Sequence, residues 1–262
     1  MTNLKALRIL AIGDVVGPAG CLCLEACLPK IKQQYKVDVV IANGENSSQH
    51  NGISHNSVKR ILNAGVDVIT TGNHAFKNYQ AASVFEQYPC VLRPANFYHS
   101  LPGVGFFTLD LGNCQVCVIN LIGNVYMPNT NANPFDTIDT ILKHNQTKIT
   151  LLDFHAEASA EKKALAFYVD GRVSAVFGTH THIQTADEQI LPLGTAYITD
   201  LGMTGPAISV LGISPEIAIK KQITGLPVKF ELALGQCEIC GAIIDISTET
   251  GKAINIERFR LV

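Results

Sequence analysis

Short, nearly continuous apolar runs recur along the first two thirds of the chain, and a polar cluster follows most of them. These runs lie at 7–13, 38–42, 67–71, 148–153 and 173–177. Runs of this length are typical of strands that are covered on both faces, as in a parallel sheet. The helices predicted between them lie at 18–35, 54–64, 134–144 and 159–169. Pro18 and Pro134 stand at the starts of two of these helices, and Ser159 is the predicted cap of the last.

The other predicted elements are mainly antiparallel. They are a strand at 90–93, a hairpin of 105–110 and 115–121, a helix from Ser214 and Pro215, and strands in the tail at 228–262. The tail alternates apolar and polar residues, which indicates antiparallel strands with one exposed face. Parallel βαβ units followed by antiparallel strands predict two packed sheets with helices outside them.

The polar clusters carry the candidate chemistry. They contain Asp14, Glu45, Asn46, Asn73, His74, His155, His180 and His182. The histidines at 180 and 182 are separated by one residue. In extended backbone, side chains at such positions point to the same face, so the two rings can aim at a common point. Functional crevices in open α/β sheets lie outside the carboxyl ends of strands, where residues far apart in sequence converge. The clusters therefore predict one shared site.

The residue types in these clusters suit a metal centre. Carboxylates, amide oxygens and imidazoles favour Mn, Fe or Zn, and a carboxylate such as Glu45 can bridge two ions. Two ions roughly 3.5–4 Å apart would clamp a phosphoryl group and generate hydroxide from water. Each cluster also has an ordinary interpretation. Asp14 could cap a helix, Glu45 and Asn46 could form a solvated turn, Asn73 could hold a tight loop, and His155 could be a surface histidine.

Composition narrows the class of protein. The chain has 262 residues, 47% of them hydrophobic, 16% charged, and a net charge of −2. This balance excludes a disordered chain and argues against a dedicated nucleic-acid-binding surface. We expect a single domain over 1–262. Without a signal peptide or an apolar segment long enough to span a membrane, we expect a cytoplasmic protein with no membrane partner.

The cysteines are expected to be reduced thiols. There are eight of them, and in the cytoplasm disulfides are rare. The C-x-x-C pairs at 114–117 and 237–240 invite a zinc interpretation, but they lie in strand-like stretches without a glycine-rich knuckle. The cysteines at 21, 23 and 27 look like packing residues on a helix. We therefore assign the cysteines no metal site.

The site motifs resemble those of the calcineurin-like metallophosphoesterases. In order they are GD at 13–14, GEN at 44–46, GNH at 72–74, His155, and GTHTH at 178–182. The longer segments GDVVG at 13–17, RPANF at 93–97, DFHAE at 153–157 and TAYITDLGMTGP at 195–206 are similar to the bacterial YmdB-type branch. The resemblance covers nearly the whole chain. It implies an α/β fold, namely a four-layer α/β/β/α sandwich of two mixed sheets.

The resemblance also implies a role for each site residue. Asp14 and His182 would hold one metal ion, Asn73, His155 and His180 a second, and Glu45 would bridge them. The superfamily motif D-x-H has Val16 in place of its histidine, and Asn46 is the expected substitute. Its oxygen favours Fe or Mn over Zn at that site. His74 would not bind metal and would be the catalytic proton donor to the departing ribose oxygen.

The implied function is a two-metal phosphodiesterase. Metal-bound hydroxide would attack the phosphorus of small phosphodiesters, with 2′,3′-cyclic nucleotides as the substrates proposed for this branch. Two alternatives remain: a broad phosphomonoesterase or nuclease, and a metal-binding regulatory protein with incidental hydrolysis. The pattern predicts no substrate-binding residues. Apolar residues in the 203–213 segment would suit a contact between copies of the chain, as in a homo-oligomer.

Overall fold

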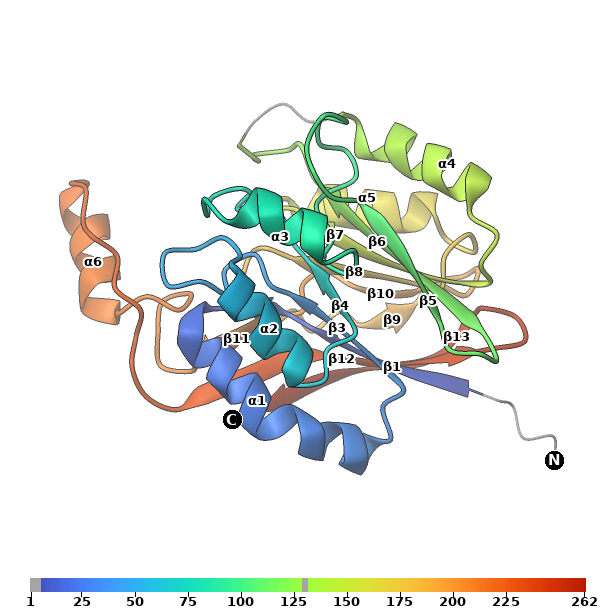
Figure 1. Cartoon of the computed structure of the whole chain (residues 1–262), viewed down its shortest axis with the longest axis horizontal. Coiled ribbons are helices and arrows are strands. Elements are labelled where there is room, and N and C mark those ends of the chain that lie inside the picture. Colours follow the sequence, from blue (N-terminus) through green and yellow to red (C-terminus); the bar gives the residue numbers. More distant parts are fainter. Residues whose placement is uncertain (1–5, 129–131) are drawn as a thin grey trace.

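The structure, a computed structural model, describes residues 6–128 and 132–262 and contains two packed β-sheets (Figure 1). The first sheet comprises β1 (Ala6–Ile12), β2 (Asp14–Val15), β3 (Val39–Asn43), β4 (Val68–Thr70), β11 (Met203–Pro206), β12 (Cys237–Ser247) and β13 (Ala253–Leu261). Its order is β2-β11-β12-β1-β3-β4, and β13 also pairs with β12. Strands β1, β3 and β4 are parallel to one another, whereas β12 is antiparallel to β1, so the sheet is mixed.

The second sheet is also mixed. It comprises β5 (Phe106–Asp110), β6 (Gln115–Ile122), β7 (Ile149–His155), β8 (Ala175–Thr179), β9 (Gln189–Ile190) and β10 (Ala196–Ile198), in the order β5-β6-β7-β8-β10-β9. Strands β6, β7, β8 and β10 run parallel, and β5 and β9 are antiparallel edges. The predicted hairpin is therefore confirmed as β5 and β6.

Helices cover the outer face of each sheet. Helices α1 (Gly17–Tyr35), α2 (His55–Asn63) and α3 (Ala81–Gln87) pack on the first sheet, and α4 (Pro134–His144) and α5 (Ser159–Tyr168) pack on the second (Figure 1). A separate apolar cluster fills the space between the sheets. The predicted four-layer α/β/β/α sandwich is confirmed.

Strand β1 explains why the first sheet is apolar on both faces. Ile9 packs between the two sheets, whereas its neighbour Leu10 packs under the helices, because successive side chains of a strand point to opposite faces. Both side chains are fully buried. Burial of a side chain of this size contributes about 1.5–3 kcal/mol, which is why a short run of such residues is enough to hold a central strand.

Several local details of the structure differ from the predictions. Residues 90–93 form isolated bridges at Val91 and Leu92 rather than a strand, and α3 was not predicted. The residue that caps α5 is Ala158, because Ser159 already belongs to the helix. Residues 228–233 form no strand. Strand β12 is buried on both faces, because Ile244 packs between the two sheets whereas Ile243 packs under the helices. The exposed face predicted for the tail occurs only on β13, at the sheet edge.

Residues 207–235, here called the arm, leave the sandwich between β11 and β12. The arm carries α6 (Pro215–Thr224), which projects from the body of the molecule (Figure 1). None of the residues of α6 is buried. The base of the arm is held by backbone hydrogen bonds, including the one from the Ser214 amide to the Glu231 carbonyl at 2.9 Å.

Among residues 6–128 and 132–262, no helix is both long enough and apolar enough to cross a membrane.

Candidate metal centre

The predicted polar clusters all lie at carboxyl ends of strands, and both sheets contribute. The first sheet places Asp14 after β1, Glu45 and Asn46 after β3, and Asn73 and His74 after β4. The second sheet places His155 at the end of β7, and His180 and His182 after β8. Because the sheets pack face to face, these ends meet along one edge of the sandwich, and the side chains contact one another across it.

Nε2 of His155 is the point on which half of the cluster converges. It lies 2.9 Å from Oδ1 of Asn73, 3.2 Å from Oε1 of Glu45 and 3.1 Å from Nδ1 of His180. Ligands that lie about 2.1 Å from a shared ion are themselves roughly 3 Å apart. Glu45, His155 and His180 are, among the described residues, a group whose ligand atoms are close enough to hold a metal ion.

The other half of the cluster surrounds Asp14. Oδ2 of Asp14 accepts a hydrogen bond from the His180 amide at 3.0 Å, and Oδ1 lies 3.7 Å from Nε2 of His182. Asp14 is fully buried, yet Oδ1 has no hydrogen-bond partner among the described residues. A buried carboxylate oxygen without a donor is costly, and a cation would satisfy it. This unpaired oxygen fits a metal at the centre.

The second ring nitrogen of each histidine is held by an oxygen. Nε2 of His180 lies 3.1 Å from Oε2 of Glu157, and Nδ1 of His182 lies 3.2 Å from the Leu211 carbonyl. Nδ1 of His155 lies 2.9 Å from Oγ1 of Thr179. Metal-binding histidines are commonly oriented in this way, because the oxygen fixes the tautomer and leaves the other nitrogen free for the ion.

Asn46 and His74 differ from the rest of the cluster. Nδ2 of Asn46 faces Nε2 of His182 at 3.3 Å, while its Oδ1 lies 2.8 Å from Nδ1 of His74. The amide of Asn46 would have to turn to offer its oxygen to an ion beside His182. The amide of His74 donates to Oε2 of Glu45 at 2.9 Å, which fixes the backbone of His74 next to the cluster.

Burial and neighbouring charges set the protonation of the cluster. Burial opposes ionisation of Glu45, but the contacts with His155 and His74 lower its pKa to about 2. Burial would lower the pKa of His155, but Glu45 and the other carboxylates raise it to about 9. Burial, together with the charge of His155, lowers the pKa of His180 to about 3. A cation placed among these groups would replace the proton on His155.

The chain was compared with known proteins. A sequence model of the YmdB-like protein family matches residues 10–259. The chain belongs to this family. A 2′,3′-cyclic-nucleotide 2′-phosphodiesterase of Bacillus subtilis (strain 168) is 43% identical over 254 residues, which are 96% of this chain and 96% of that protein.

Solved structures agree with the family membership. A crystal structure described as a novel phosphatase of Mycoplasma pneumoniae matches with a TM-score of 0.93 at 34% identity, covering 99% of this chain and 94% of that one. A Staphylococcus aureus protein assigned as a 5′-nucleotidase shares the fold, with a TM-score of 0.66 at 18% identity over 98% of this chain and 55% of that one.

A buried ion pair beneath the histidine loop was missed by the sequence analysis. Nζ of Lys162, on α5, lies 2.8 Å from Oδ2 of Asp200, and both side chains are almost completely buried. Asp200 also accepts from the amide of Thr181, between the two histidines, at 3.1 Å, and from the amide of Gly202 at 2.9 Å. The Gly202 carbonyl in turn accepts from the amide of Asp14 at 3.0 Å. The pair thus ties three parts of this family member's centre together.

A second supporting network was also missed. Asp153, on β7, accepts from the hydroxyls of Thr70 and Thr179 and from the side-chain amide of Asn43, so it links the two sheets under His155. Burial raises the pKa of Asp153 to about 6, although His155 and both threonines oppose the shift. Asn43 ends β3, and Asp200 follows β10 by two residues. The pattern of polar residues at strand ends, which predicted the site, could therefore also have identified these two residues.

Backbone geometry constrains the site at two places. A Cβ on Gly72 would lie 2.1 Å from Cδ2 of His155, so only glycine leaves room for the imidazole there. His180 and His182 have φ values of 105° and 64°, in the left-handed region that non-glycine residues seldom adopt. Such conformations persist where the surrounding contacts hold them, and they are common at functional sites.

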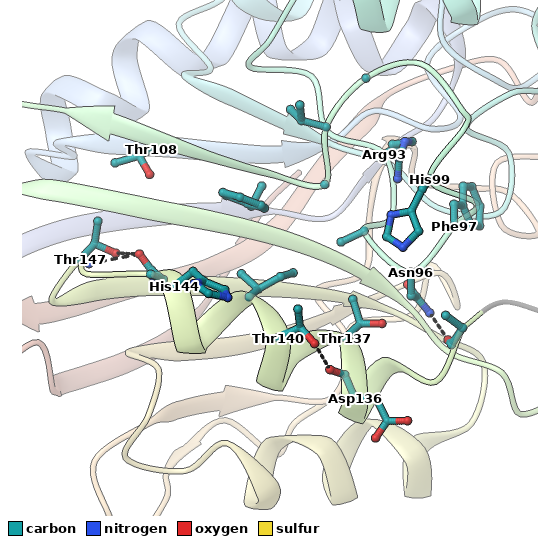
Figure 2. Close-up of a pocket in the computed structure, with 18 of the residues that line it drawn as sticks. Arg93, Asn96, Phe97, His99, Thr108, Asp136, Thr137, Thr140, His144 and Thr147 are labelled. Carbon is teal, nitrogen blue, oxygen red and sulfur yellow. Dashed lines mark hydrogen bonds between the residues drawn. The ribbon is translucent and has the colours of Figure 1, made fainter.

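A large cavity lies away from these residues. It has a volume of about 770 Å³ and lies between β5 and α4 (Figure 2). Arg93, His99 and His144 are among the residues that line it, but none of the eight predicted site residues does. Arg93 is bound there to the carbonyls of the neighbouring loop, such as that of Pro94 at 2.9 Å. The donor chemistry, and not the size of a cavity, therefore locates the centre.

All eight cysteines are free in the structure. No cysteine belongs to a metal-binding group within the described part of the chain. On β12, residues three apart such as Cys237 and Cys240 point to opposite faces, so this pair cannot bind one ion as a knuckle would. The expectation of reduced cysteines is consistent with this arrangement.

Proposed function

We propose that this protein is a metal-dependent phosphodiesterase that hydrolyses small phosphodiesters, with 2′,3′-cyclic nucleotides as substrates. The observation that carries the proposal is the convergence of Asn73, Glu45 and His180 on Nε2 of His155. Donor sets of this kind serve phosphoryl transfer in proteins. Membership in the YmdB-like family and the Bacillus subtilis relative, at 43% identity, support a hydrolytic phosphoesterase.

The residues present fit two metal ions. Asp14, His182 and Asn46 would hold one ion, Asn73, His155 and His180 would hold the other, and Glu45 would bridge them. Bound there, the ions would neutralise phosphate charge and lower the pKa of water enough to supply hydroxide near neutral pH. The amide oxygens of Asn46 and Asn73 make the donor set harder, which favours Fe or Mn over Zn.

The proton transfer is assigned to His74. Nδ1 of His74 lies 2.8 Å from Oδ1 of Asn46, and an Asn46 amide turned to offer its oxygen to an ion would instead donate from Nδ2 to this Nδ1. Nε2 of His74 has no partner among the described residues, so Nε2 is the atom left to meet a substrate. Protonation by Nε2 would help the ribose oxygen to leave, because an alkoxide is a poor leaving group. Burial lowers the pKa of His74 in the free chain, and Glu45 opposes this shift. The negative charge of a bound phosphodiester would also favour the imidazolium.

Metal-stripped and reconstituted protein tests the proposed activity. We expect the stripped protein to leave 2′,3′-cyclic nucleotides intact, and protein reloaded with Mn or Fe to convert them to nucleoside monophosphates, measured by liquid chromatography. Hydrolysis of nitrophenyl phosphate without any hydrolysis of phosphodiesters would contradict the proposal.

His74→Ala tests the assigned proton donor. Turnover of a cyclic nucleotide should fall by roughly 10²-fold or more, while metal content stays unchanged. Turnover of bis(p-nitrophenyl) phosphate should fall much less, because nitrophenolate is a good leaving group and needs no proton. His144→Ala, at an exposed histidine on α4, is the matched control. If the His74 variant hydrolyses both substrates as fast as the wild type, the assignment is wrong.

A phosphomonoesterase is the second candidate. It is favoured by the Mycoplasma pneumoniae structure described as a phosphatase, which is 34% identical to this chain. Comparison of kcat/KM for a nucleoside monophosphate and a cyclic nucleotide separates the two. We expect the diester to be preferred.

A further inference from the structure

A second, smaller cavity is lined by the loops that follow Asn46 and His74. It has a volume of about 320 Å³ and lies between the loop at 47–50, the segment at 78–80 and the first turns of α1 and α2. Both segments begin close to a site residue, since Ser47 directly follows Asn46 and Asn78 is four residues after His74. The stretched chain spans at most about 3.6 Å per residue. Ser48 is therefore within about 7 Å of Asn46 along the chain, which is within the length of a nucleotide.

The two loops contact each other behind the cavity. Gly52 has a φ of 73°, and a Cβ at this position would lie 2.7 Å from the amide nitrogen of Asn78. The amide of Ser48 donates to the Gly52 carbonyl at 3.1 Å, which closes the first loop. Oδ1 of Asn78 accepts from the amide of Gln80 at 2.9 Å, which shapes the second segment. The walls of the cavity are thus set by the same loops that carry Asn46 and His74.

The cavity offers neutral hydrogen-bonding groups. The residues that line it include serines, asparagines and glutamines, and no described residue of the lining is acidic. Its one arginine, Arg60, is neutralised by a bidentate pair with Glu25, at 2.6 and 2.7 Å. A metal ion or a charged peptide would find no countercharge here. A neutral ring with both donors and acceptors matches the lining.

Two serines of the cavity lining have buried hydroxyls that lack a hydrogen-bond partner among the described residues. Ser47 and Ser48 are more than nine-tenths buried, and the Oγ atom of each has no hydrogen-bond partner among the described residues. A buried hydroxyl without a partner is unfavourable, so these atoms point to a ligand that completes them. They belong to the two residues that directly follow Asn46 in the sequence.

An aromatic side chain stands at the mouth of the cavity. Tyr79 is 91% exposed, which is unusual for a tyrosine in a folded protein, and its hydroxyl accepts from Nε2 of the adjacent Gln80 at 3.1 Å. The ring face is therefore open to a flat partner. Stacking on an aromatic ring tolerates every base, because each base has a π-face.

We propose that this cavity is the nucleobase subsite of the enzyme, an inference that rests on the proposed function. The phosphate of a 2′,3′-cyclic nucleotide lies at the metal centre, and the base extends along the loop at 47–50. Tyr79 stacks on the base, and the hydroxyls of Ser47 and Ser48 with the nearby amides bond to its edge. Because the contacts are neutral and few, the subsite prefers nucleotides to base-free diesters without strong selection among bases.

Tyr79→Ala tests the subsite. We expect KM for 2′,3′-cyclic AMP to rise roughly tenfold with kcat nearly unchanged, since stacking contributes to binding and not to the chemical step. Methyl riboside 2,3-cyclic phosphate, which has the same reacting group but no base, should be hydrolysed equally by variant and wild type. Tyr79→Phe keeps the ring and should resemble the wild type. Tyr98→Ala, at another exposed tyrosine, is the matched control.

Ser48→Ala is an independent test, because it removes a hydroxyl that has no hydrogen-bond partner among the described residues. It should raise KM for the cyclic nucleotide severalfold and leave the riboside unaffected. If either variant changes both substrates equally, or neither, the base does not bind in this cavity.

Direct binding separates this inference from the proposed function. Saturation-transfer NMR should detect adenosine on the wild type and a loss of signal on Tyr79→Ala. If the wild type cleaves no cyclic nucleotide, the proposed function fails, and the adenosine signal still decides whether the cavity binds a base. Absence of that signal from the wild type would overturn the subsite.

Discussion

The metal centre and the arm distribute polar and apolar side chains in opposite ways. At the centre, Asp14, Glu45 and His155 are polar and buried, and each is held by several contacts. In the arm, Ile223 and Leu234 are apolar and largely exposed, at 78% and 93%. Both arrangements are unfavourable for an isolated chain. Polar groups lose their hydration at the centre, and apolar side chains contact water in the arm. The comparison suggests that each region has a binding partner outside the chain: a metal ion at the centre, and a second protein surface at the arm.

The two regions differ in burial but are physically connected. The centre lies at the ends of central strands in two sheets, whereas α6 has ten residues and no buried side chain. An isolated helix of that length is marginal in water. Even so, the carbonyl of Leu211, at the base of the arm, lies 3.2 Å from Nδ1 of His182. The arm therefore orients one histidine of the centre.

The largest effect is expected from loss of the central carboxylate. Glu45→Gln keeps the shape of the side chain but removes the negative charge between the two proposed metal positions. Hydrolysis of phosphodiesters should fall by about a thousandfold or more, with lower metal content by elemental analysis. Ile223→Glu, in the arm, should leave the rate unchanged. Activity of the Glu45 variant within tenfold of the wild type would contradict the central role.

The buried ion pair beneath the centre should have the next largest effect. Lys162→Met leaves the Asp200 carboxylate buried without its cation, which typically costs about 3–5 kcal/mol of stability. Urea denaturation measures the loss. Arg258→Met, which breaks an exposed pair with Glu188, should cost about 1 kcal/mol or less. A loss below about 1 kcal/mol for the Lys162 variant would show that the pair does not hold the centre.

The stability of the metal-free protein should depend on pH through His155. Burial opposes its protonation, but Glu45 and the other carboxylates raise its pKa from 6.5 to about 9. A raised pKa in the folded state stabilises the fold fully below pH 6.5, and this stabilisation is lost as the pH rises through 9. We expect denaturation midpoints to fall over this range in chelator.

Metal should weaken that dependence, because binding requires the neutral imidazole and replaces its proton. The control is His155→Gln, which lacks the titrating group and should show a flatter profile in chelator. An equally steep loss of stability in this variant would assign the effect to another residue.

The smallest effect on the chain itself is expected from changes in the arm. Ile223→Glu combined with Leu226→Glu should alter unfolding free energy by about 0.5 kcal/mol or less, because neither side chain is buried. If the arm is the contact of a homo-oligomer, the variant should sediment as a smaller species than the wild type in analytical ultracentrifugation. Identical sedimentation of the two proteins would remove the arm from consideration as that contact.

Much of the fold could be predicted because the central strands are apolar on both faces. Strand β3 is an uninterrupted apolar run up to Asn43, where its polar cluster begins. Strand β7 is mostly apolar and ends at the site residue His155. Helix α3 was missed because it has seven residues and no side-chain cap. Strand β12 was misread because its second face is covered by α1, about 200 residues away in sequence.

The site was predictable for a related reason, and its supports were not. Equivalent positions after parallel strands must lie at one edge, so the clustering of Glu45 with His155 follows from the strand pattern. Lys162 gave no such signal, because a lysine in a helix is normally exposed and its partner is 38 residues away. The roles of the site residues, the single domain and the cytoplasmic location stay predictions.

The left-handed backbone at His180 and His182 has a consequence for how this protein can change. Glycine would adopt these φ values at less cost, so the native residues sacrifice folding free energy at two positions in one short loop. Mutations that stabilise the molecule are therefore available inside the centre, and each would remove a side chain that the proposed reaction needs. Under selection for heat resistance alone, we would expect substitutions at these two histidines before substitutions in the sheets that support the loop.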